Sequence, residues 1–183
     1  MKKHNALWLL LLALCSLFAG CKKDNAGSTQ QDILPPAIQT GANTFGCLVN
    51  GKVWIPKGYS GTGTPNPHTI YATGLNGIPY LSIDTRQYEK NNSVGEIFIS
   101  FGNLNHLGFY MASTDFKFSI GWNTVLANCG MTTLDSTVQS WGGGLITKVD
   151  IPKQIIAGTF AFKAKRTGCD TVYITDGRFD IKF

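Results

Sequence analysis

The sequence has few of the residues that catalytic sites and nucleic-acid interfaces require. Charged residues make up 15% of the chain, and only 3 of its 183 residues are histidine. No basic cluster is longer than Lys22-Lys23 or Lys165-Arg166, which argues against a nucleic acid as partner. Long helical periodicity is also missing, because no window repeats apolar residues at helical spacing over three turns. These absences argue against a helical bundle and against a strongly basic binding protein.

Motifs that bind metals or activate nucleophiles are missing as well. His68 and His106 lie far apart, and the sequence has no Cys-x-x-Cys or His-Glu-x-x-His pair. The glycine-rich segment 58–63 lacks both the glycine spacing of a nucleophile elbow and the Gly-Lys-Ser/Thr of a phosphate loop. The acidic residues, including Glu89 and Glu96, are scattered. We therefore expect no catalytic residue, cofactor or metal. A zinc site on the two histidines and a hydrolase with a cryptic site remain minor alternatives.

One short motif near the N-terminus is specific. Two lysines precede an apolar run over residues 6–18, which is shorter than the roughly 20 residues of a membrane-spanning helix. The run ends in Leu17-Phe18-Ala19-Gly20-Cys21, which resembles the lipobox of bacterial lipoproteins. The resemblance implies that the chain is cut before Cys21 and that lipid is attached to the Cys21 thiol. Residues 1–20 are then a lipoprotein signal peptide, and its loss removes two lysines and lowers the formal charge from +5 to +3.

A lipid on Cys21 predicts the membrane as a partner and the cell envelope as the location. Two or more acyl chains make such an attachment stable, and the outer membrane is the favoured site. Whether the domain faces the periplasm or the cell surface stays open. Residues 21–42 are polar and show no hydrophobic period, so we expect a lipidated N-terminus followed by a flexible tether. Residues 43–183 are long enough to form a single domain with its own core.

Alternation of apolar and polar residues with turn signals predicts antiparallel sheet in residues 43–183. Asn50-Gly51 is the preferred pair for a type I′ hairpin, and this turn places Cys47 opposite Trp54. Asp176-Gly177 predicts a second tight turn near the end of the chain. Further strands are expected at residues 68–73, 78–85, 96–101, 116–120, 145–151, 155–164, 171–175 and 178–183. About nine to eleven strands suit an antiparallel β-sandwich, with a lipocalin-like β-barrel as the alternative.

Three pieces of the sequence together resemble small Bacteroidota lipoproteins that have no assigned activity. These pieces are CKKDN after the lipobox, TFGCLVNGKVWIP at the start of the domain, and IIAGTFAFKAK with DTVYITDGRFDIKF near its end. The resemblance covers both ends of the mature domain. It implies an exported, lipid-anchored, all-β domain, and it transfers no catalytic residue.

Of the five cysteines, three remain once Cys15 is removed with the signal peptide and Cys21 is assigned to the lipid. In an oxidising compartment we expect one disulfide among them and one thiol left over. Cys129 and Cys169 both lie in turn-like sequence, so their pairing is favoured over a domain without a disulfide. Cys47 lies in a predicted strand opposite Trp54, where a buried thiol packs well.

Aromatic residues are the remaining candidates for contact with a ligand, and Tyr59, Trp122 and Trp141 are the ones selected. Exposed rings on loops at the end of a sandwich can bind a sugar or a protein, and the alternative role is to cap the core. The favoured function is therefore a non-catalytic domain that binds a glycan or an envelope protein. The runner-up is a lipocalin-like carrier of an apolar small molecule, with a cavity lined by Phe116, Phe118, Phe160 and Phe162.

Overall fold

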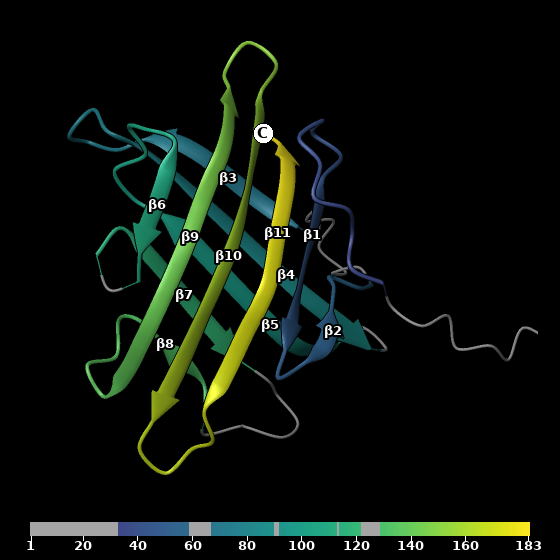
Figure 1. The fold of residues 1–183 in the computed structure, drawn as a ribbon, viewed down its shortest axis with the longest axis vertical. Helices are drawn as coiled ribbons and strands as arrows, with labels where there is room; N and C mark the ends of the chain where they lie inside the picture. Colours follow the sequence, from purple (N-terminus) through teal and green to yellow (C-terminus); the bar gives the residue numbers. More distant parts are fainter. Residues whose placement is uncertain (1–32, 59–66, 90–91, 113, 122–128) are drawn as a thin grey trace, which may run out of the picture. The chain divides into compact units, whose positions relative to one another are not determined.

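The computed structural model describes residues 33–58, 67–89, 92–112, 114–121 and 129–183. These residues form strands and turns without a helix, which confirms the all-β class (Figure 1). None of them belongs to a helical segment that could cross a bilayer. The strands are β1 (Thr44–Val49), β2 (Lys52–Trp54), β3 (His68–Thr73), β4 (Pro79–Glu89), β5 (Asn92–Phe101), β6 (Gly108–Met111), β7 (Phe116–Gly121), β8 (Met131–Thr132), β9 (Val138–Asp150), β10 (Ile155–Arg166) and β11 (Val172–Lys182).

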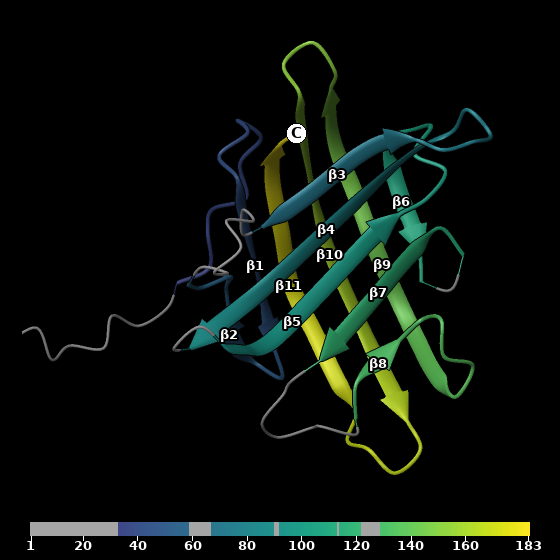
Figure 2. The same ribbon diagram turned by 180° about the vertical axis from the view of Figure 1, so that it is seen from behind.

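The strands form two antiparallel sheets that face one another. One sheet has six strands in the order β2-β1-β11-β10-β9-β6, and the other has five in the order β3-β4-β5-β7-β8. The six-stranded sheet is in front in Figure 1 and the five-stranded sheet is in front in Figure 2, and their strands cross at an angle. No ladder between the described strands joins the two sheets. The predicted β-sandwich is therefore confirmed, and the alternative of a closed lipocalin-like barrel is wrong.

Aromatic rings fill the space between the sheets. Phe116 and Phe118 of β7 point inward and are almost completely buried. Phe118 stacks on Phe162 of β10 with ring centroids 4.1 Å apart, and Phe116 lies 5.6 Å from the same ring. Phe160 lies beside Phe162, so the four phenylalanines assigned to a carrier's cavity are in contact with one another or with a shared neighbour. They pack the core instead of lining an empty space.

Two glycines in the six-stranded sheet are required by these rings. A Cβ atom on Gly144 of β9 would collide with the ring of Phe101, and a Cβ atom on Gly177 of β11 would collide with the ring of Phe160. Glycine allows the Phe101 ring to approach the backbone of the opposite sheet, and the Phe160 ring of β10 to lie over its cross-strand neighbour Gly177. The packing of aromatic rings in the core thus requires glycine at these two positions of the sheet.

The hairpin between β1 and β2 agrees with its prediction. Asn50 and Gly51 have φ angles of 48° and 78°, as a type I′ turn requires. Cys47 is paired with Trp54, and both side chains are buried in the core.

The turn predicted at Asp176-Gly177 is wrong. β11 runs without interruption between β1 and β10, and both of its ladders shift register beside these two residues. Asp176 has a φ of 51°, so the pair forms a β-bulge inside a long strand. A local turn signal is overridden here because β11 is paired on both of its edges.

The loop expected around Trp141 is also wrong, because Trp141 and the three glycines after it lie inside β9. The strands β6 and β8 were not predicted. β8 has two residues, and β6 has four, so neither is long enough to give a clear alternating pattern.

Residues 33–42, which the sequence assigns to the tether, lie against the six-stranded sheet. Leu34 and Pro35 lie beside Gly46 of β1, and Lys148 Nζ of β9 donates a hydrogen bond to the carbonyl oxygen of Gln39 at 3.0 Å. The tether therefore remains a prediction for residues 21–32, which lie outside the described residues together with Cys21.

Asp180 of β11 holds the end of this segment, and we call the contact the N-terminal latch. Its carboxylate accepts hydrogen bonds from the backbone N–H groups of Thr40, Gly41 and Ala42 at 2.9, 2.7 and 3.1 Å. The Thr40 hydroxyl donates a fourth at 3.1 Å, and Asp180 is only 1% exposed. Burial raises the pKa of Asp180, but the four hydrogen bonds together lower it by more, so the pKa lies below its ordinary value.

We expect Asp180→Asn to lower the free energy of unfolding by about 2–3 kcal/mol, because a neutral amide offers one acceptor oxygen to three backbone donors. The latch stabilises the fold above the ordinary aspartate pKa of about 3.9, and this contribution is lost as the pH falls through the lowered folded pKa. Urea unfolding of both proteins between neutral and strongly acid pH measures it. The exposed Asp170→Asn is the matched control, and equal losses in the two variants would remove the latch as a source of stability.

Candidate functional site

A groove of about 460 Å³ crosses the outer face of the six-stranded sheet, the face turned toward the viewer in Figure 1. We call it the sheet-face groove. Its lining comes from β6, β9, β10, β11 and the N-terminal segment, and includes Phe109, Leu145, Ala161, Arg178 and Ala37. The latch positions Ala37 at the groove because it fixes the segment three residues further along the chain. Residues far apart in the sequence therefore form a single recess.

The strand register arranges the outer face in three rows that run across the strands. One row contains Phe109, Leu145, Thr159 and Arg178. The next contains Met111, Gly143 and Ala161, and the third contains Trp141, Lys163 and Tyr173. Gly143 and Ala161 at the centre of the middle row line the groove and, being among the smallest residues, form its floor. The first row lies on one side of this floor, and the third row is its neighbour on the other side.

Glycine is required at the centre of this floor. A Cβ atom on Gly143 would collide with the carbonyl oxygen of Tyr110 on β6 and would lie 2.9 Å from the ring of Phe109. Close approach of β6 to β9 therefore excludes a side chain at this position. The floor is recessed as a consequence of how the edge strand packs.

Large apolar side chains stand exposed around the floor. Phe109, Met111, Trp141, Leu145 and Tyr173 are between 39% and 61% exposed. Contiguous exposed apolar side chains on a folded domain usually mark a surface that binds something. Among the described residues, these five side chains form the main exposed apolar cluster that we identify.

Charged groups on this face are held in defined positions. The Lys163 ammonium group lies 4.5 Å from the centroid of the Trp141 ring, a cation–π contact that orients both side chains. Arg178 Nε donates to the carbonyl oxygen of Asp176 at 3.0 Å, and its terminal nitrogen lies 4.0 Å from the Asp176 carboxylate. Arg178 also donates to the carbonyl oxygen of Pro35, which joins the groove wall to the N-terminal segment.

Of the three aromatic residues selected from the sequence, Trp141 is exposed and lies in the row next to Gly143 of the groove floor, although it is not one of the residues that line the groove. Tyr59 and Trp122 lie outside the described residues. Sequence reasoning missed Phe109, Met111, Leu145 and Tyr173. The signal for Leu145 and Tyr173 was present, since each alternates with buried neighbours, but identification of a shared face required the pairing of β9, β10 and β11.

A second polar cluster lies on the five-stranded sheet. Arg86 of β4 is 3.0 Å from the Asp84 carboxylate and 3.3 Å from the Glu96 carboxylate of β5. Burial raises the pKa of Glu96, Arg86 lowers it, and Asp84 raises it, with a net upward shift. The guanidinium group pairs with both acids, and neither acid lines the sheet-face groove. The contacts are those of an ion-pair network rather than of two cooperating catalytic acids.

The histidines lie in different surroundings. His68 begins β3, while His106 precedes β6 and stacks on Tyr110 with ring centroids 4.9 Å apart. Among the described residues, no group of three or more histidine, cysteine, aspartate or glutamate side chains is arranged to hold a metal ion.

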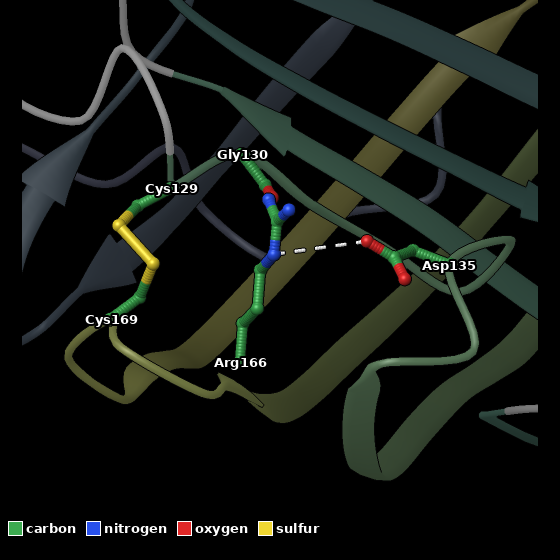
Figure 3. The surroundings of a disulfide bond; sticks show 5 residues. All are labelled: Cys129, Gly130, Asp135, Arg166 and Cys169. Atoms are coloured by element: carbon green, nitrogen blue, oxygen red, sulfur yellow. Dashed lines mark hydrogen bonds and ion pairs between the residues drawn. A yellow bond between two sulfur atoms is a disulfide. The ribbon is translucent and has the colours of Figure 1, made fainter.

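The structure joins Cys129 to Cys169 by a disulfide, the pairing that the sequence favours (Figure 3). Arg166 reinforces the same region by donating to the Gly130 carbonyl oxygen at 3.2 Å and lying 3.8 Å from the Asp135 carboxylate. Cys47 is a free, buried thiol, and burial raises its pKa to about 12. A thiol that stays protonated at neutral pH is a poor nucleophile, so Cys47 has a packing role.

Comparison with protein-family models, with curated proteins and with solved structures found no match to this chain.

We expect replacement of both Cys129 and Cys169 by serine to lower the free energy of unfolding by about 3–4 kcal/mol, because the bond closes a long loop with a sequence separation of 40. Chemical denaturation measures the loss. Reduction of the native protein should give the same loss, and reduction of the double variant should give none. Alkylation of unfolded, unreduced protein should label Cys47 and neither of the paired cysteines. A native protein whose unfolding is unchanged by reduction would contradict the disulfide.

Proposed function

We propose that the chain is a lipid-anchored protein of the cell envelope whose non-catalytic β domain binds a protein or glycan partner at the sheet-face groove. The observation that carries the proposal is the set of exposed apolar side chains around a recessed floor on one sheet face. Such a surface costs free energy in water unless another molecule covers it.

The anchor rests on the lipobox-like sequence that ends at Cys21, and on the similarity to Bacteroidota lipoproteins. Because residues 33–42 lie against the sheet, residues 22–32 are what is left for the predicted tether. A flexible segment of that length spans about 18 Å on average. The groove would then stay close to the membrane that holds the lipid, with the outer membrane as the favoured site.

The two other functions have less support. An apolar carrier needs an interior cavity, and the rings of Phe116, Phe118, Phe160 and Phe162 are packed together in the core. A hydrolase needs acids that converge on a cleft, and the Asp84 and Glu96 carboxylates instead pair with Arg86.

The anchor predicts that Cys21→Ser moves the protein from the membrane fraction to the soluble fraction of the cells that make it. The physical reason is the loss of the acyl chains, since each buried methylene contributes about 0.8 kcal/mol to membrane attachment. Fractionation followed by immunoblotting measures the shift, and Cys47→Ser is the control because that thiol is buried in the domain. A membrane fraction that is unchanged in Cys21→Ser would contradict the anchor.

The groove predicts where a partner can be trapped. A photoreactive benzophenone side chain in place of Tyr173 should give covalent adducts in intact cells, because Tyr173 belongs to the row beside the floor. The same side chain in place of Leu134, which is exposed in a turn, should give few. Adducts are measured as a shift in mass on a denaturing gel. Equal yields at the two positions, or none at either, would contradict binding at this face.

A further inference from the structure

The sheet-face groove is elongated across the strands. Its lining passes from β6 over β9 and β10 to β11, which are neighbours in the sheet. Three spacings between adjacent strands give a length of about 14 Å. An occupant that follows the floor is therefore an extended molecule that lies across the strands rather than parallel to them.

Rings border this floor on both sides. Trp141 and Tyr173 stand in the row on one side, and Phe109 stands in the row on the other. All three are about half exposed, so each presents a ring surface to the floor or to the solvent above it. Flat apolar surfaces in this position match the apolar C–H face of a pyranose ring, whose hydroxyl groups lie along its edge and can remain hydrated.

The charge beside the floor is mainly positive. Lys163 stands in the row next to the floor and Lys165 lies two residues further along β10, and both are exposed on the outward side of this strand. Arg178 lines the groove on the opposite side. Asp176 is the carboxylate that lines the groove, and it is already paired with Arg178. The two lysines therefore leave an excess of positive charge on one side of the floor, which is complementary to carboxylate groups on a ligand.

We propose that the sheet-face groove binds an acidic oligosaccharide, a chain of pyranose rings that carry carboxylates. The C–H faces of its sugar rings stack on Trp141 and Tyr173, and its carboxylates form ion pairs with the ammonium groups of Lys163 and Lys165. This inference rests on the proposed function and names the chemical class of the partner. The cation–π contact of Lys163 with Trp141 places a charge and a ring within reach of the same sugar unit.

Two other classes of partner fit the face less well. An extended peptide would place its N–H and C=O groups against strands whose backbone is already paired in the sheet, and these groups would lose their hydration without new partners. A bilayer surface is broad, and it would contact the rims of the groove while leaving the recessed floor formed by Gly143 and Ala161 empty.

The test is isothermal titration calorimetry on the full-length chain, expressed with its own N-terminal segment and purified in a zwitterionic detergent without a sugar head group. The probes are oligogalacturonate, oligoalginate and fully methyl-esterified oligogalacturonate, which has the same rings without the charge. We expect at least one acidic probe to bind about tenfold or more tightly than the methyl ester, and raised salt to weaken its binding.

Variants locate the site. Trp141→Ala and Lys163→Ala are each expected to weaken binding of the acidic probe by about tenfold or more. Lys153→Ala, which removes an equivalent charge from an exposed turn, is expected to change binding less than about twofold. Thermal unfolding of each variant checks that the domain remains folded, and Lys163→Arg should retain binding because it preserves the charge beside Trp141.

Each contrary result has a distinct meaning. Equal affinity for the acidic probe and its methyl ester overturns the acidic assignment and leaves the proposed partner-binding function standing. Failure of both acidic probes, with adducts still formed at position 173, also overturns the inference and leaves a different partner at the groove. Binding to phosphatidylglycerol vesicles that requires Trp141, without binding of either oligosaccharide, assigns the face to a membrane instead. Failure of the probes together with failure of the adducts removes the inference and the proposed function.

Discussion

The packing of aromatic rings between the two sheets is the constraint on which the rest of the structure depends. Phe101 of the five-stranded sheet lies so close to Gly144, and Phe160 of β10 so close to its cross-strand neighbour Gly177, that neither glycine can carry a Cβ atom. Gly143 lies next to Gly144 on β9 and faces outward, and the close approach of β6 prevents it from carrying a Cβ atom. The glycine run in β9 thus admits a ring on its inner side and forms a recessed floor on its outer side. Core packing and the candidate binding surface are two results of the same short segment.

The N-terminal latch connects this surface to the rest of the chain. Asp180 is buried in a strand interior, where an uncompensated carboxylate would be costly, and four hydrogen bonds from residues 40–42 compensate it. The same latch brings Ala37 to the groove and Pro35 within reach of Arg178. Residues 33–42, which follow the proposed lipid anchor, therefore form part of the groove wall.

The polar groups of the domain divide into those that neutralise one another and those that remain available to a ligand. Asp84, Arg86 and Glu96 form an ion-pair network on one sheet, and Asp180 is satisfied by the latch. Lys163 and Lys165 face outward beside exposed rings. This distribution supports the proposed binding function, because exposed charges lie near the groove and the paired acids lie elsewhere.

Local chemistry determined much of what the sequence predicted. Asn50-Gly51 determined a hairpin and its register, alternation determined the β class, and the turn-like surroundings of Cys129 and Cys169 favoured their disulfide. Tertiary structure decided where β11 and β9 run without a turn and which side chains form the groove, because these features depend on which strands become neighbours. Because β11 is paired on both edges, Asp176-Gly177 forms a bulge instead of the expected turn. The glycines after Trp141 lie inside β9 instead of in a loop. Side chains from β6, β9, β10 and β11 meet only when the sheet brings those strands together, and a linear sequence does not contain that order.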